Sequence, residues 1–156
     1  MTGARLSLLW GHHRDIYGLD FGVLGNISEV SFTGLAISGI FNVTHGATHV
    51  IGLQAAGITN VNVQKTSVYG VQLALGVNDN IAESDVIGLQ LAAINLGDHT
   101  DIKGLQVGLY NTAQNVYGLQ IGIVNVAASL HGIQIGLVNF NHTGPFVVSP
   151  ILNVGF

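Results

Sequence analysis

Apolar and polar positions recur along the chain in one motif that is centred on a glycine. The position two residues before this glycine is always apolar, and so are the positions one and three residues after it. Alternation with a period of two residues is typical of a strand with one buried face. Glycine and β-branched residues would weaken a helix here. The pattern therefore predicts one strand per copy, with the apolar residues after the glycine facing the core.

The motif occurs eight times, which predicts a repeat architecture. The anchoring glycines are Gly18, Gly34, Gly52, Gly70, Gly88, Gly104, Gly118 and Gly132. The apolar position before each glycine is out of phase with those after it. We therefore expect the chain to bend at the glycine, where the missing Cβ permits positive φ or close backbone approach.

Two polar columns accompany the glycines. Six copies carry a glutamine between the two apolar positions that follow the glycine: Gln54, Gln72, Gln90, Gln106, Gln120 and Gln134. All eight copies carry an asparagine at the predicted strand end: Asn26, Asn42, Asn60, Asn78, Asn95, Asn111, Asn125 and Asn139. Stacked amides form hydrogen-bonded ladders between in-register strands, and asparagine also tolerates the left-handed conformation at a turn.

The first four copies have one more residue between the glycine and the asparagine than the last four. One extra residue reverses the facing of every side chain that follows it in a strand. It therefore indicates either a β-bulge or a wider corner in the early copies.

These columns predict an all-β repeat protein, a small parallel β-solenoid of about eight coils. In a parallel stack, equivalent residues form continuous columns, whereas an antiparallel meander would alternate its turn types. One copy alone buries too few side chains to fold, so neighbouring copies must cover it. We expect a single domain over residues 1–156, with an N-terminal cap at 1–15, repeats at 16–141 and a C-terminal cap at 142–156.

Composition narrows the class of protein. Apolar residues make up 48% of the chain and charged residues 8%, which excludes disorder. Four cations and a net charge of −4 give no basic surface for nucleic acid. Cysteine is absent, and no apolar run reaches the roughly 18 residues of a membrane helix. Met1 leads directly into strand-like residues, so a targeting segment for export is expected outside this chain.

Candidate chemical groups lie in the segments between copies. They are His12, His13, His45, His49, Glu83, Asp85, Asp98, His99 and Asp101. Their spacing is not repeated, so we interpret them as exposed turn residues and predict no metal site, no cofactor and no catalytic residue. Tyr17, Tyr69 and Tyr117 share one column but are interrupted by other residue types, which disfavours a stacking platform for sugars or bases.

The columns GLQxGxxN and GLQxAGxxN, with the lead-in RLSLLWGHHRDIYGLDFG and the ending GLVNFNHTGPFVVSPILNVGF, resemble an uncharacterised family of bacterial surface-repeat proteins of the cell envelope. The resemblance covers roughly residues 5–156. It implies export and a location at the envelope or surface, and it supplies no activity. Asp20 and Ala36 depart from the glutamine column, which puts the N-terminal end of that ladder in doubt.

The leading hypothesis is a non-catalytic structural or interaction module exposed at the bacterial cell envelope. A flat face of glycine and glutamine is expected to support self-association, and membrane association is compatible with the low charge. The alternative is a small outer-membrane β-barrel, because apolar residues alternate back from Phe156. Barrels show long loops on one side and aromatic girdles, and neither is evident in the sequence.

Overall fold

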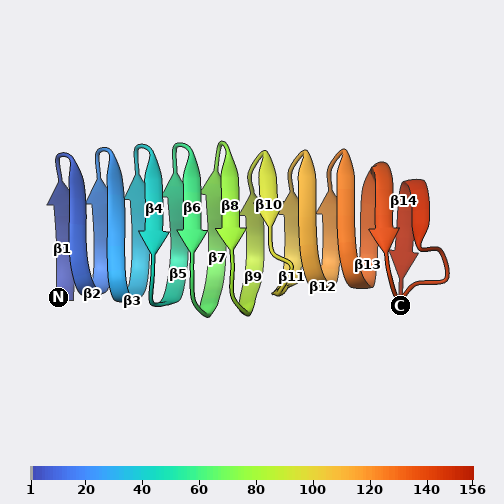
Figure 1. Ribbon diagram of the computed structural model, residues 1–156, viewed down its shortest axis with the longest axis horizontal. Helices are drawn as coiled ribbons and strands as arrows, with labels where there is room; N and C mark the ends of the chain where they lie inside the picture. The colour runs from blue at the N-terminus through green and yellow to red at the C-terminus, as the bar shows by residue number, and fades with distance from the viewer. Residues whose placement is uncertain (1) are drawn as a thin grey trace.

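The computed structural model describes residues 2–156, and within that range every regular element is a strand. The strands are β1 (Thr2–Ser7), β2 (Trp10–Gly22), β3 (Gly25–Ser38), β4 (Phe41–Thr44), β5 (Ala47–Ala56), β6 (Thr59–Asn62), β7 (Thr66–Ala74), β8 (Val77–Asn80), β9 (Ser84–Leu91), β10 (Ile94–Leu96), β11 (Thr100–Val107), β12 (Tyr110–Ile121), β13 (Val124–Asn141) and β14 (Val148–Gly155). They wind into a flattened rod (Figure 1).

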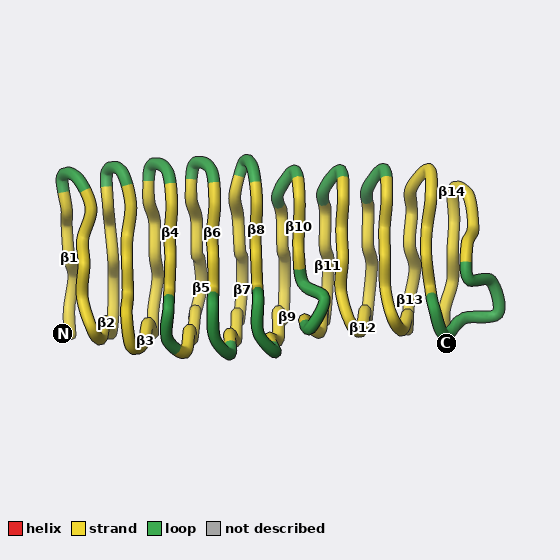
Figure 2. Tube along the Cα trace, in the orientation of Figure 1, coloured by secondary structure: helices red, strands yellow, loops and turns green. Residues whose placement is uncertain are grey.

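The rod has two walls, each a parallel sheet. The first wall contains β5, β7, β9 and β11, and the second contains β4, β6, β8 and β10. The long strands β2, β3, β12 and β13 pass around an edge and contribute to both walls (Figure 2). The parallel solenoid predicted from the sequence is confirmed. The antiparallel meander is wrong, because β13 and β14 form the sole antiparallel pair among residues 2–156.

The facing of the strands is opposite to the prediction. In β7, Thr66, Val68, Gln72 and Ala74 are buried, whereas Val71 and Leu73 face outwards and are half-buried. The same holds in β9 and β11. The interior therefore contains the glutamines together with the apolar column before the glycine. The apolar column includes Val50, Val86, Val116 and the 0% exposed Ile102.

Each anchoring glycine has a positive φ, between 106° and 151°, as the sequence predicts. The alternation of side chains runs through the glycine without a change of phase, so the expected bend is not needed to explain the pattern. At Gly104, an added Cβ would overlap the carbonyl oxygen of Gly88 in the preceding coil. Gly52 is the exception: β5 has a bulge that places Val50 opposite Gly34, and a Cβ on Gly52 would meet nothing within 4 Å.

The extra residue of the early copies widens a corner. Gln72 pairs with Gln90 and Asn78 pairs with Asn95, so both columns stay in register across the change in length. The additional residue therefore lies in the turn between the walls, at Leu75–Gly76. The asparagines begin the second wall after this turn instead of ending a strand, and among the described residues Ile151 alone has a positive φ without being a glycine.

The two ends of the rod differ. At the N-terminal end, β1 pairs in parallel with β2 and places Gly3 opposite Gly18, so residues expected as a cap form a further partial coil of the same pattern. At the C-terminal end, β14 runs antiparallel to β13 and covers the last coil. The segment between them bulges out of the stack at the C-terminal end (Figure 2).

Candidate functional site

The asparagine column forms a continuous buried ladder. From Asn26 to Asn139, each Nδ2 donates to Oδ1 of the asparagine in the next coil, over seven hydrogen bonds of 2.8 to 3.0 Å. Each Nδ2 also donates to a backbone carbonyl of the first wall, for example Asn95 to Val107 at 2.8 Å. The asparagines are at most 4% exposed. This satisfied amide network ties the two walls together and fixes their register.

The glutamine column forms a second ladder of opposite polarity. From Gln72 to Gln134, each Nε2 donates to Oε1 of the glutamine in the preceding coil, over five hydrogen bonds of 2.6 to 3.1 Å. The ladder starts at Gln54. At its other end Oε1 of Gln134 is buried and accepts no hydrogen bond. Asp20 and Ala36 occupy the two earlier positions of this column, so the glutamine ladder does not extend to the N-terminal end.

A third amide column was not recognised in the sequence. Asn62 and Asn80 lie two residues after ladder asparagines, and Asn62 donates to Asn80 at 2.9 Å. Gln54 exchanges two hydrogen bonds with Asn62, at 3.2 and 3.3 Å, and Gln72 does the same with Asn80. In later coils the glutamine donates to a backbone carbonyl instead, as Gln106 does to Thr112 at 3.1 Å.

A charged pair replaces the amides at the N-terminal end. Arg5 occupies the position equivalent to the glutamines in β1, and its guanidinium binds the buried carboxylate of Asp20 in the next coil. Gly11 faces Asn26 in the asparagine column, and the absence of a side chain there leaves room for the guanidinium. A bidentate pair of this kind compensates the desolvation of both charges. Neither residue was singled out as a pair from the sequence.

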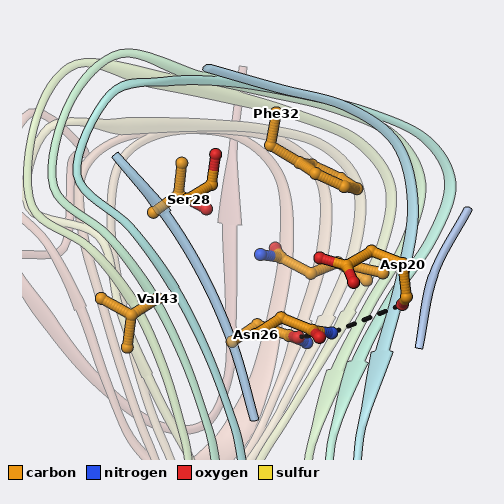
Figure 3. Close-up of a pocket in the computed structure, with 9 residues that line it drawn as sticks. Asp20, Asn26, Ser28, Phe32 and Val43 are labelled. Atoms are coloured by element: carbon orange, nitrogen blue, oxygen red, sulfur yellow. Dashed lines mark hydrogen bonds between the residues drawn. The ribbon is translucent and has the colours of Figure 1, made fainter. Parts of the chain in front are cut away.

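A small cavity interrupts the interior beside Ala36 (Figure 3). Its volume is about 10 Å³, close to the space that one water molecule needs. Phe32, which takes the place of the smaller aliphatic residues in its column, points into the interior next to Ala36. Compared with the other coils, this coil therefore has a larger residue in the aliphatic column and a smaller residue in the glutamine column.

Among the predicted chemical candidates, Asp85 and Asp101 are register partners on β9 and β11, and the side chain of His13 lies outside the part of the chain that the structure describes. His12 pairs with Glu29 at 2.9 Å and Asp85 with Lys103 at 3.1 Å, both on the surface. The hydrogen bond from Lys103 to Asp85 raises the pKa of that ammonium. Burial, and secondarily the charge of Asp98, raises the pKa of Asp79. Residues 2–156 contain no group of three or more histidine, aspartate or glutamate side chains that could hold a metal ion.

The outer surface carries most of the aliphatic side chains. The columns one and three residues after each glycine face outwards on the first wall, and the turns between the walls are apolar apart from Ser38 and Thr59. These turns are residues 22–25, 38–41, 56–59, 74–77, 91–94, 107–110, 121–124 and 135–138. We call this row of turns the apolar edge; it is the upper row in Figure 1. Leu75, Leu109 and Leu137 on it are 78%, 58% and 68% exposed.

Shallow apolar grooves run along the apolar edge. One lies over the middle coils, between Leu73, Leu91 and Val107 of the first wall and the turn residues Leu75 and Leu109. Two others lie nearer the ends of the rod. A repeated aliphatic surface of this extent is typical of a site for macromolecules or lipid.

The glutamines that we expected on a face for self-association lie inside the rod. The glutamines are 0 to 1% exposed, so they are unavailable to a partner. The misassignment arose because an apolar–glutamine–apolar strand has the same period whichever side faces the core. The signal in the sequence was the row of largely apolar turns, which indicates that apolar side chains face outwards along the whole molecule.

No helical segment within residues 2–156 has the length and apolar character needed to cross a bilayer. Comparison with known proteins adds no assignment: no family model matches the chain, and neither a curated protein nor a solved structure is significantly similar to it.

Proposed function

We propose that this protein is a non-catalytic structural or interaction module exposed at the bacterial cell envelope. The observation that carries the proposal is the distribution of its side chains. Amides fill the interior as hydrogen-bonded ladders, and aliphatic residues repeat along the outside. Such a surface presents the same contact once per coil, which suits binding to an extended or fluid partner.

The location rests on the resemblance of the GLQxGxxN columns to bacterial surface-repeat proteins. A rod whose amide ladders are hydrogen-bonded from coil to coil also suits an exposed setting, because local opening leaves ladder amides unpaired and is therefore costly.

Fractionation of the native bacterium, followed by labelling of intact cells with a membrane-impermeant amine reagent, tests the proposal. Lys65 and Lys103 have exposed side chains that accept the reagent. We expect the protein in the envelope fraction, with both lysines labelled without lysis. Recovery in the cytosol, with labelling only after lysis, would contradict the proposed location.

A further inference from the structure

We propose that the apolar edge inserts into one leaflet of a lipid layer, with the rod lying along the membrane surface. This inference deepens the proposed envelope function by naming the partner of the interaction surface. It starts from the position of the charges. Of the twelve Asp, Glu, Lys and Arg residues, none lies on the apolar edge.

The charges gather at the opposite row of turns, which we call the polar edge. Nine of them lie on it or on the adjoining strand positions: Arg14, Asp15, Glu29, Lys65, Glu83, Asp85, Asp98, Asp101 and Lys103. Arg5 and Asp20 pair inside the rod. Asp79 faces outwards on the second wall in register with Val61, and partial burial raises its pKa. The rod is therefore amphipathic across its width.

The shape of the apolar surface favours lipid over a second copy of the chain. Aliphatic columns cover the upper part of the first wall, continue over the edge and descend the second wall, where Val43, Val61 and Val126 face outwards. A rigid partner would cover one of these three sides, whereas fluid acyl chains cover all of them together. About four residues per wall give an apolar height of roughly 13 Å. Half of the hydrocarbon core of a bilayer is about 15 Å thick.

The backbone of the apolar edge is prepared for an environment without water. Turn amides donate to carbonyls of the preceding turn, as Ile58 does to Ile40 at 2.7 Å and Ile123 to Leu109 at 2.9 Å. Unpaired peptide groups are costly in hydrocarbon, and this stacking pairs them within the protein.

Aromatic residues mark the margin of the apolar surface on the first wall. Tyr17, Tyr69 and Tyr117 occupy the column just before the glycine and are 49%, 47% and 45% exposed. They lie next to the aliphatic columns, in a column that also contains Lys103, and tyrosine is favoured in membrane proteins at the level where apolar surface meets charge. Because the chain has a net charge of −4 and few cations, insertion is expected to depend on apolar burial and not on anionic lipid.

Flotation with phosphatidylcholine vesicles, combined with single-cysteine labelling, tests the inference. The chain has no cysteine, so Leu75→Cys and Ile81→Cys each place one environment-sensitive fluorophore on the same coil. Leu75 lies on the apolar edge and Ile81 on the polar edge, with 78% and 52% exposure. We expect the protein to float with the vesicles, the Leu75 label to shift to the blue and be quenched several-fold by lipids brominated on the acyl chain, and the Ile81 label to stay unchanged.

Two triple variants serve as a matched pair. Leu75→Lys/Leu109→Lys/Leu137→Lys places charge on the apolar edge and is expected to abolish flotation. Circular dichroism should stay unchanged, because the three side chains are exposed in the parent.

The control Val30→Lys/Ile81→Lys/Val147→Lys changes side chains that are 46%, 52% and 52% exposed and lie away from the apolar edge. It should float as the parent does. Loss of flotation in this control, or retention of flotation in the first variant, would contradict the inference.

Three further results would overturn it: no flotation of the parent, equal quenching of both labels, or burial of the Leu75 label in a dimer formed without vesicles. The last result would assign the edge to a second copy of the chain. Each of these results is obtained with purified protein and therefore does not depend on the outcome of the cell-fractionation test of the proposed location.

Discussion

At the residue scale, the fold depends on amides that hydrogen-bond along the rod. A single amide–amide bond adds only about 0.5–1.5 kcal/mol of net stability, but a buried amide left without its partner costs about 1–3 kcal/mol. The ladders therefore act mainly by penalising every register except the native one. The positive φ of the glycine positions also disfavours any register that places another residue type there, since only glycine adopts that conformation without strain.

Replacing one ladder asparagine should destabilise the protein strongly. Asn95 accepts from Asn78 at 3.0 Å and donates to Asn111 at 2.8 Å. Asn95→Ala leaves a donor and an acceptor unpaired, so we expect a loss of about 2–5 kcal/mol in the free energy of unfolding, measured by urea titration. The control Gln114→Ala removes an exposed amide from β12 and should stay within about 0.5 kcal/mol of the parent. Equal effects would show that the ladder is not structural.

Two glycine variants separate backbone strain from steric overlap. Gly104 has a φ of 141° and Gly52 a φ of 106°. Gly52→Ala meets free space and should cost about 1–3 kcal/mol from strain alone. Gly104→Ala adds an overlap with the carbonyl of Gly88, and we expect a larger loss of stability. Thermal unfolding followed by circular dichroism compares them, and a smaller effect at Gly104 would refute the close approach.

At the element scale, each coil adjusts its own interior while keeping the common register. In the second repeat Phe32 and Ala36 exchange bulk, and a cavity of about 10 Å³ remains beside them. In β1 and β2 the charged pair Arg5–Asp20 takes over the glutamine positions. The extra residue of the early copies is absorbed at the corner and leaves both ladders in register.

The exchange of bulk predicts a strong coupling between positions 32 and 36. Phe32→Val alone enlarges the cavity, and Ala36→Gln alone crowds Phe32, so each should cost about 1–3 kcal/mol. Together the two changes recreate the interior of the other coils and extend the glutamine ladder. We expect the double variant to be more stable than the sum of the single effects by roughly 0.5–3 kcal/mol in urea unfolding. Additive effects would mean that the two residues do not share one space.

Repeat spacing alone determined much of this organisation in advance. The glycine column predicted positive φ, and eight asparagines at one phase predicted the parallel ladder. The facing of the strands was not accessible from period two alone, because Leu–Gln–Leu alternates equally well in either orientation. Leucine is usually buried and glutamine usually exposed in folded proteins. This fold does the opposite, because the glutamine and asparagine side chains in the interior hydrogen-bond to one another. The Arg5–Asp20 contact required knowing that β1 is itself a coil.

At the scale of the whole molecule, stacking in register makes the length of the rod proportional to the number of coils. Adjacent strands lie about 4.8 Å apart, and each coil contacts mainly its neighbours. Whole coils are therefore removable, whereas fragments of a coil are not. Removing residues 71–104 joins Gly70 to Leu105 and deletes two complete repeats between equivalent glycines.

The distance between two spin labels measured by double electron–electron resonance tests this organisation most directly. Glu29→Cys and Ala128→Cys label one column of the polar edge, six coils apart, and we expect a backbone separation of about 29 Å. Deleting residues 71–104 should shorten it by about 10 Å with a narrow distribution and unchanged circular dichroism. Deleting residues 71–95, which breaks the register, should unfold the chain. An unchanged or broadly distributed distance after the two-coil deletion would contradict the in-register parallel solenoid.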